Sequence, residues 1–156
     1  MTLSPIKSFD YKVDVSSFKN KFIDVDNSLW TEEIKLNIIK LMWLGKKTEL
    51  YKKFYDENFF RPIIDYLGGD DKRYNIFFSL LEKGTKILPH VDKNIKKTRR
   101  RIHIPIITNS RVLFFNNGHF LNMKEGHVYE IDNSRLHAVN NASDKDRIHL
   151  IIDCYE

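Results

Sequence analysis

The second half of the chain is a succession of short apolar segments separated by turn sequences, and this spacing constrains the fold more than any other feature. The segments cover residues 76–81, 101–107, 111–115, 120–123, 127–131, 136–139 and 147–153. The stretches between them are rich in Gly, Asn, Asp and Ser, which favour tight turns. Because many short strands at even spacing are typical of a β-sandwich or a jelly-roll barrel, we predict a mainly β fold.

The first 74 residues show a different pattern and are predicted to form a helical part that packs on the barrel, within one domain covering residues 1–156. A short strand and a turn are expected over residues 1–28. Apolar residues then recur at helical spacing and predict a helix that Gly45 ends or bends. A second helix is expected around Phe54, and Pro62 is expected to begin a third. The residues that predict the first helix are Ile34, Ile38, Leu41 and Met42.

A His-Val-Asp triplet, from His90 to Asp92, follows the first of the predicted core strands. On an extended chain, residues two apart point to the same side, so this imidazole and this carboxylate can reach one metal ion together. A third ligand is available at His137, on a later predicted strand. Two histidines and one carboxylate on one face of a metal form the facial triad of non-haem Fe(II) oxygenases, which leaves positions open for a co-substrate and O2.

Two arginines on predicted strands suit the same chemistry. Alternation in residues 101–107 places Ile102 and Ile104 on one face of a strand and Arg101 and His103 on the other, where they can line a pocket. Arg147 begins the last predicted strand. A dicarboxylate co-substrate must chelate the metal at one end and be held at the other, and arginine supplies a rigid two-pronged donor for the far carboxylate.

These motifs resemble those of the aspartyl/asparaginyl β-hydroxylase family of Fe(II)- and 2-oxoglutarate-dependent dioxygenases. The resemblance covers about residues 75–153. It rests on the approach to the first ligand from Phe78 to His90, on Arg101-Ile102-His103, on His137-Ala138-Val139-Asn140 and on the closing segment from Arg147 to Asp153. It implies a double-stranded β-helix, also described as a jelly-roll or cupin-like fold, with N-terminal helices.

The resemblance also implies a role for each site residue. His90, Asp92 and His137 would bind Fe(II) and form the catalytic centre. Ser79 and Arg147 would hold the distal carboxylate of 2-oxoglutarate, and Arg101 with His103 would lie beside the carboxylate that chelates iron. The co-substrates would be 2-oxoglutarate and O2, and the products succinate and CO2. The substrate would be an amino-acid side chain of the Asp, Asn or Pro type, in a peptide or protein or as the free amino acid.

Other interpretations stay open. The same ligand set would suit a non-catalytic, cupin-like module that binds a metal or a small molecule. The net charge of +5 arises largely from one basic run, which is either a solvated loop or a rim that attracts an acidic substrate. Nucleic acid is not expected as a partner, because no aromatic residue interleaves with the run to stack on bases. The basic run contains Lys93, Lys96, Lys97, Arg99, Arg100 and Arg101.

Cysteine content and hydropathy bear on the compartment. The only cysteine is Cys154, which excludes an internal disulfide and fits a reducing compartment. The first residues lack the apolar run of a signal peptide, and no stretch has the length of a membrane span. We therefore expect a cytoplasmic protein that does not associate with membranes, and the sequence leaves its oligomeric state open.

Overall fold

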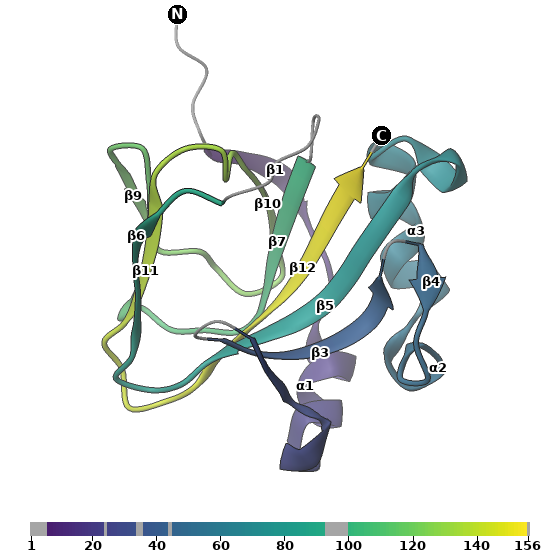
Figure 1. The fold of residues 1–156 in the computed structure, drawn as a ribbon, viewed down its shortest axis with the longest axis horizontal. Helices are drawn as coiled ribbons and strands as arrows, with labels where there is room; N and C mark the ends of the chain where they lie inside the picture. Colours follow the sequence, from purple (N-terminus) through teal and green to yellow (C-terminus); the bar gives the residue numbers. More distant parts are fainter. Residues whose placement is uncertain (1–5, 24, 34–35, 44, 93–99, 156) are drawn as a thin grey trace, which may run out of the picture.

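Two antiparallel sheets form the framework of the molecule, as the computed structural model shows for residues 6–23, 25–33, 36–43, 45–92 and 100–155 (Figure 1). The larger sheet contains β1 (Ile6–Lys12), β2 (Thr31–Glu33), β3 (Leu36–Trp43), β4 (Lys46–Lys47), β5 (Arg73–Leu81), β7 (Arg100–Ile107), β10 (His127–Ile131) and β12 (Arg147–Tyr155). The smaller sheet contains β6 (Lys86–His90), β8 (Val112–Asn116), β9 (His119–Leu121) and β11 (His137–Asn141). The helices are α1 (Ser16–Ile23), α2 (Tyr51–Phe54) and α3 (Glu57–Tyr66), with 3-10 turns η1 (Asn27–Leu29) and η2 (Gly69–Asp71).

The chain passes repeatedly between the two sheets. The strand order is β1-β10-β7-β12-β5-β3-β2 in the larger sheet, where β4 pairs with β3, and β6-β11-β8-β9 in the smaller one. From β5 onward, β5, β7, β10 and β12 therefore belong to one sheet, and β6, β8, β9 and β11 to the other. This arrangement confirms the predicted double-stranded β-helix. Among the described residues, no helix is both long and apolar enough to cross a membrane.

Helices cover the outer face of the larger sheet, and the hydrophobic core lies between them (Figure 1). Ile102 and Ile104 on β7 are fully buried there, together with Phe18 of α1 and Phe60 of α3. The predicted alternation on this strand is confirmed, because Arg101 and His103 face the other way and line the space between the two sheets. The larger sheet is thus apolar on its helix-covered side, and its inner face is free to carry polar residues.

The prediction of a helix ending at Gly45 is wrong, because Ile38, Leu41 and Met42 lie on β3, and Ile34 lies outside the described residues. β3 pairs with β5, with Asn37 opposite Leu80 and Ile39 opposite Phe78. Ile38 faces the inner side of the sheet and Ile39 the helix-covered side, so both faces of β3 are buried. A strand that is apolar on both faces lacks clean alternation, and its apolar residues also match helical spacing by coincidence.

Two other expectations for the N-terminal part need correction. The predicted strand ends at Lys12, and α1 follows where only a turn was expected. Phe18 and Phe22 lie four residues apart on α1, and both rings contact Phe78, at centroid distances of 5.6 and 4.8 Å. Pro62 lies inside α3 and does not begin it. The helix begins after Asp56, whose carboxylate accepts hydrogen bonds from the backbone N–H groups of Asn58 and Phe59.

Most of the predicted basic run, residues 93–99, lies outside the described residues. Its last two cations are ion-paired on β7. Arg100 donates to the carboxylate of Glu130, with Nε 2.6 Å from Oε1, and Arg101 donates to Asp153, also at 2.6 Å. These two side chains therefore belong to the folded barrel and do not form a freely solvated loop.

Candidate active site

A cavity of about 660 Å³ lies between the two sheets. The inner face of the larger sheet lines one side of it, and the smaller sheet contributes His90, His137 and three apolar side chains to the other. All seven residues that the sequence singled out for the site line this one cavity. They are Ser79, His90, Asp92, Arg101, His103, His137 and Arg147.

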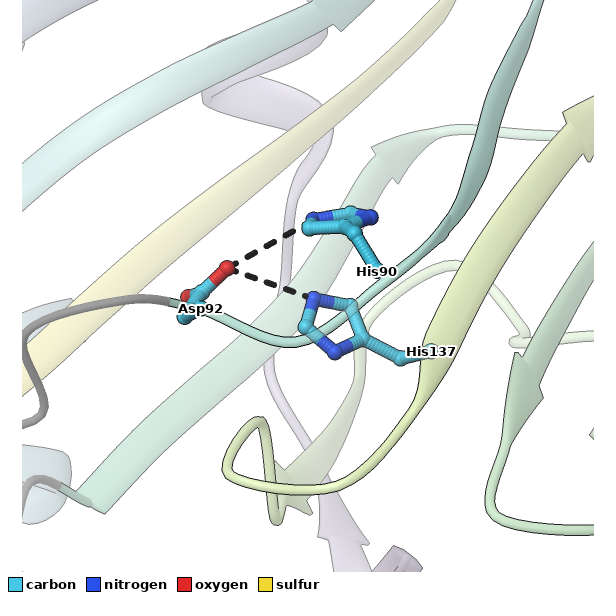
Figure 2. Close-up of side chains that lie close together, drawn as sticks. All are labelled: His90, Asp92 and His137. Atoms are coloured by element: carbon cyan, nitrogen blue, oxygen red, sulfur yellow. Dashed lines mark ion pairs between the residues drawn. The ribbon is translucent and has the colours of Figure 1, made fainter.

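The three predicted metal ligands converge at one place in this cavity. His90 at the end of β6 and His137 at the start of β11 are paired positions of neighbouring antiparallel strands, and their rings lie 4.3 Å apart between centroids. Oδ1 of Asp92 lies 3.5 Å from Nε2 of each histidine, and Figure 2 shows both rings beside this oxygen. The three ligand atoms all lie within 4.8 Å of one another. Strand pairing thus brings together residues that are 47 positions apart in sequence.

Backbone hydrogen bonds orient the two imidazoles. Nδ1 of His90 lies 2.8 Å from the carbonyl oxygen of Leu88, and Nδ1 of His137 lies 2.9 Å from that of Arg135. A carbonyl oxygen only accepts, so in the neutral form of each ring Nδ1 carries the proton and donates it. The lone pair of each ring is therefore on Nε2, the atom that faces Asp92. This is the arrangement of metal-binding histidines, in which the second nitrogen donates to a fixed acceptor.

The other oxygen of Asp92 is held by two donors. Oδ2 accepts a hydrogen bond from the side-chain amide of Asn133 at 2.5 Å and from Nη1 of Arg101 at 3.1 Å. Burial disfavours the charged carboxylate, but its contact with His137 and the positive charge of Arg101 outweigh burial and hold the pKa of Asp92 well below its usual range. Asp92 is therefore ionised at neutral pH and able to act as a metal ligand.

Arg147 on β12 is buried without a counter-ion. It is 1% exposed, and its Nη2 donates a hydrogen bond to the hydroxyl of Ser79 at 3.3 Å. Its Nε has no hydrogen-bond partner, and no carboxylate of the described residues forms an ion pair with it. Burial lowers the pKa of Arg147 to about 9, so the guanidinium is still charged at neutral pH. A charged group in this position is costly unless an anion binds to it.

Two further histidines are buried next to these arginines. His103 and His149 come from neighbouring strands, β7 and β12, and their Nδ1 atoms lie 3.4 Å apart. Burial lowers the pKa of both rings well below the usual value; the positive charge of Arg147 adds to this effect at both, and that of Arg101 at His103. Both imidazoles are therefore neutral at neutral pH. His103 lines the cavity, and Nε2 of His149 is buried without a partner.

Several residues that line the cavity lie outside the predicted set, and Trp43 is one of them. Two others contact site residues directly: Asn133 donates to Asp92, and Asp153 accepts from Arg101. Asn133 lies in a segment that was read only as a turn. Asp153 is paired in register with Arg101 across β12 and β7, so knowledge of that register would have identified it. The other tryptophan, Trp30, stacks on Phe22 at 5.8 Å between ring centroids.

Comparison with known proteins gives one family and one fold. The profile of the family described as aspartyl/asparaginyl beta-hydroxylase matches residues 62–156. No curated protein sequence matches the chain. The chain superposes on a prolyl-4-hydroxylase from Pseudomonas putida with a TM-score of 0.66 and 11% identity, over 99% of this chain and 94% of that one.

Two other solved structures are similarly close. A 2OG-Fe(II) oxygenase family oxidoreductase from Burkholderia pseudomallei gives a TM-score of 0.65 at 12% identity, over 96% of this chain and 84% of that one. A viral collagen prolyl hydroxylase from Paramecium bursaria Chlorella virus-1 gives 0.63 at 9% identity, over 97% and 96%. At such low identity, these similarities establish the fold alone.

Proposed function

Because the chain belongs to the aspartyl/asparaginyl β-hydroxylase family, which consists of Fe(II)- and 2-oxoglutarate-dependent dioxygenases, we propose that it hydroxylates an amino-acid side chain. The side chain would be of the Asp, Asn or Pro type, in a peptide or protein or as the free amino acid. Succinate and CO2 would be released. The buried guanidinium of Arg147, which has no carboxylate partner among the described residues, is the observation that carries this proposal.

The residues present fit Fe(II). Two Nε2 lone pairs and one ionised carboxylate oxygen face one another, and this donor set suits a non-haem iron site with open positions. His90, Asp92 and His137 would hold the metal. When bound, Fe(II) with 2-oxoglutarate and O2 would supply the oxidising chemistry, and the protein would supply orientation and a largely buried, apolar environment.

The remaining predicted residues would position 2-oxoglutarate. Arg147 and Ser79, which already contact each other, would donate to its distal carboxylate, and the anion would neutralise the buried guanidinium. The neutral ring of His103 would lie beside the carboxylate at the metal. Three N–H groups of Arg101 donate to Asp153 and Asp92, so its contacts support a role at the metal ligand more directly than one at the co-substrate.

Turnover without a substrate tests the proposal. Protein mixed with Fe(II), 2-oxoglutarate and O2 should form succinate slowly, and His90→Ala and Arg147→Ala should each abolish this. His127→Ala is the control, because this histidine lies on β10 and does not line the cavity. A product 16 Da heavier than a candidate amino acid or peptide would then identify the substrate.

Binding measurements show how to interpret a protein that forms no succinate. Absence of both succinate and binding of N-oxalylglycine, a 2-oxoglutarate mimic, would contradict the proposal. Binding of a metal without any binding of N-oxalylglycine would instead favour the non-catalytic, cupin-like module.

A further inference from the structure

The two oxygens of Asp92 have different surroundings. Oδ1 faces Nε2 of both ligand histidines at 3.5 Å. Oδ2 accepts hydrogen bonds from Asn133 and Arg101, at 2.5 and 3.1 Å. An oxygen that already accepts from an amide and from a guanidinium has little capacity left for a cation. The carboxylate is therefore oriented with one oxygen towards the metal position.

Asp92 needs such support because it is not part of a strand. His90 and His137 are fixed by the pairing of β6 with β11, whereas Asp92 follows the end of β6 and belongs to no strand. Asn133 holds it twice, since its backbone carbonyl also accepts from the N–H of Asp92 at 3.4 Å. Asn133 itself is only 2% exposed, so its amide has little freedom to move.

Arg101 connects this clamp to the larger sheet. Its Nε and Nη2 donate to the two oxygens of Asp153 at 2.6 and 2.8 Å, and Asp153 is 2% exposed on β12. A two-pronged arginine–carboxylate pair fixes the plane of the guanidinium, so Nη1 is aimed at Oδ2 of Asp92. The position of Asp92 thus depends on Asn133 and, through Arg101, on the larger sheet, while the two histidines are set by the smaller sheet.

We propose that Asn133 and Arg101, the latter held by Asp153, are positioning residues that restrict Asp92 to a single metal-facing oxygen. This inference rests on the proposed function, because it assigns the clamp to the metal site. An octahedral ion with two histidine nitrogens and one carboxylate oxygen keeps three positions free. A carboxylate that gripped the ion with both oxygens would leave only two, which is too few for a chelating co-substrate and O2 together.

Mn(II), which forms octahedral sites and is not oxidised during the measurement, is a suitable probe. Titration calorimetry should show that Asn133→Ala binds Mn(II) roughly 10- to 100-fold more weakly than the wild type, the usual cost of losing a group that orients a metal ligand. Relaxation of water protons by bound Mn(II) should report about three coordinated waters in the wild type.

Asn122→Ala is the matched control. The amide of Asn122 donates to two backbone carbonyl groups, and its side chain does not line the cavity. It should bind Mn(II) as the wild type does. Circular dichroism establishes that each variant is folded. If Asn133→Ala does not fold, Asn133→Ser replaces it, because serine keeps a polar side chain that is smaller than asparagine.

Wild-type Mn(II) affinity in the folded Asn133 variant would overturn the positioning role. A count of about two waters in the wild type would overturn the single-oxygen assignment. Wild-type affinity in the Asn133 variant leaves the proposed hydroxylase function intact, whereas a count of about two waters, or a wild-type protein that binds no Mn(II), would count against that function as well. Succinate formation by the wild type then decides whether the function fails.

Discussion

Arg101 and Arg147 lie on the same inner face of the larger sheet and have opposite electrostatic surroundings. Arg101, on β7, donates to both oxygens of Asp153 and to Asp92. The guanidinium of Arg147, on β12, donates to an uncharged hydroxyl, and no carboxylate of the described residues pairs with it. The same residue type therefore serves two purposes in one cavity. A guanidinium whose counter-ions come from the fold is part of the structure, and one whose counter-ion is missing is available for an anionic ligand.

The pKa values express this difference. Burial disfavours the charge on Arg101, but the carboxylates of Asp153 and Asp92 outweigh burial, and its pKa is raised above the ordinary arginine value. Arg147 experiences burial alone, and its pKa is lowered to about 9. Substitutions should therefore separate the two sites, because we assign one guanidinium to the stability of the fold and propose the other as the binding group for the co-substrate.

The largest expected effect concerns co-substrate binding. Arg147→Met should weaken binding of N-oxalylglycine to the Mn(II)-loaded protein by at least roughly 30-fold, because removing one partner of a buried, hydrogen-bonded charge pair costs about 2–5 kcal/mol. Calorimetric titration measures this. Arg135→Met is the control, since Arg135 pairs with Asp132 at the surface and does not line the cavity. Unchanged affinity in Arg147→Met would mean that the co-substrate carboxylate binds elsewhere.

The second effect concerns stability. Asp153→Asn should lower the free energy of unfolding by about 3–5 kcal/mol, because it leaves Arg101 buried with one of its two carboxylates missing. For a chain of this size, the melting temperature should fall by roughly 6–20 °C. Asp132→Asn breaks the exposed pair with Arg135 and should change the melting temperature by only a few degrees. Equal effects of the two substitutions would show that Asp153 is not a structural anchor.

The sequence predicts the core strands and the metal ligands because both depend on short-range patterns. Alternate residues of β7 face the helices and the cavity, and this difference is visible in Ile102, His103 and Ile104. The His90–Asp92 triplet lies within three residues. Its convergence with His137 follows once β6 and β11 are neighbours, which the family resemblance implied.

The clamp on Asp92 and the strand β3 depend on long-range pairing, so the sequence does not predict them. Asp153 meets Arg101 only because β12 and β7 align in one particular register. A shift of that register by a single residue would turn the carboxylate to the helix-covered face. β3 is buried on both faces, because Ile39 packs in the helix-covered core and Ile38 packs with Phe77 and Ile151 on the inner side, and the apolar sequence that this requires resembles a helix. The sequence likewise does not predict that Arg147 lacks a carboxylate partner among the described residues, because this depends on every side chain around the guanidinium.

The smallest effect concerns the charge of Arg147 in the ligand-free protein. Arg147→Met should raise the free energy of unfolding at pH 7.5 by about 1–2 kcal/mol, and the melting temperature by roughly 2–8 °C, because it removes a buried charge and keeps an apolar stem. The same variant is expected to lose co-substrate binding. A gain in stability with a loss of binding is typical of a ligand site. Asp153→Asn should instead lower the free energy of unfolding.

The pH dependence of this gain tests its cause. The pKa of Arg147 is about 9 in the folded protein, against an ordinary value of 12.5. Below pH 9 both folded and unfolded chains carry the charge, so the wild type bears the full cost of burying it. Between pH 9 and 12.5 the folded state binds fewer protons than the unfolded state, and wild-type stability rises with pH relative to the methionine variant.

Thermal unfolding at pH 7.5 and pH 10 measures this effect. The excess stability of Arg147→Met over the wild type should be smaller at pH 10 by about 1 kcal/mol. If the stability difference between Arg147→Met and the wild type does not change with pH, better packing of the methionine explains it. The two arginines would then not differ in the energetic cost of their charges.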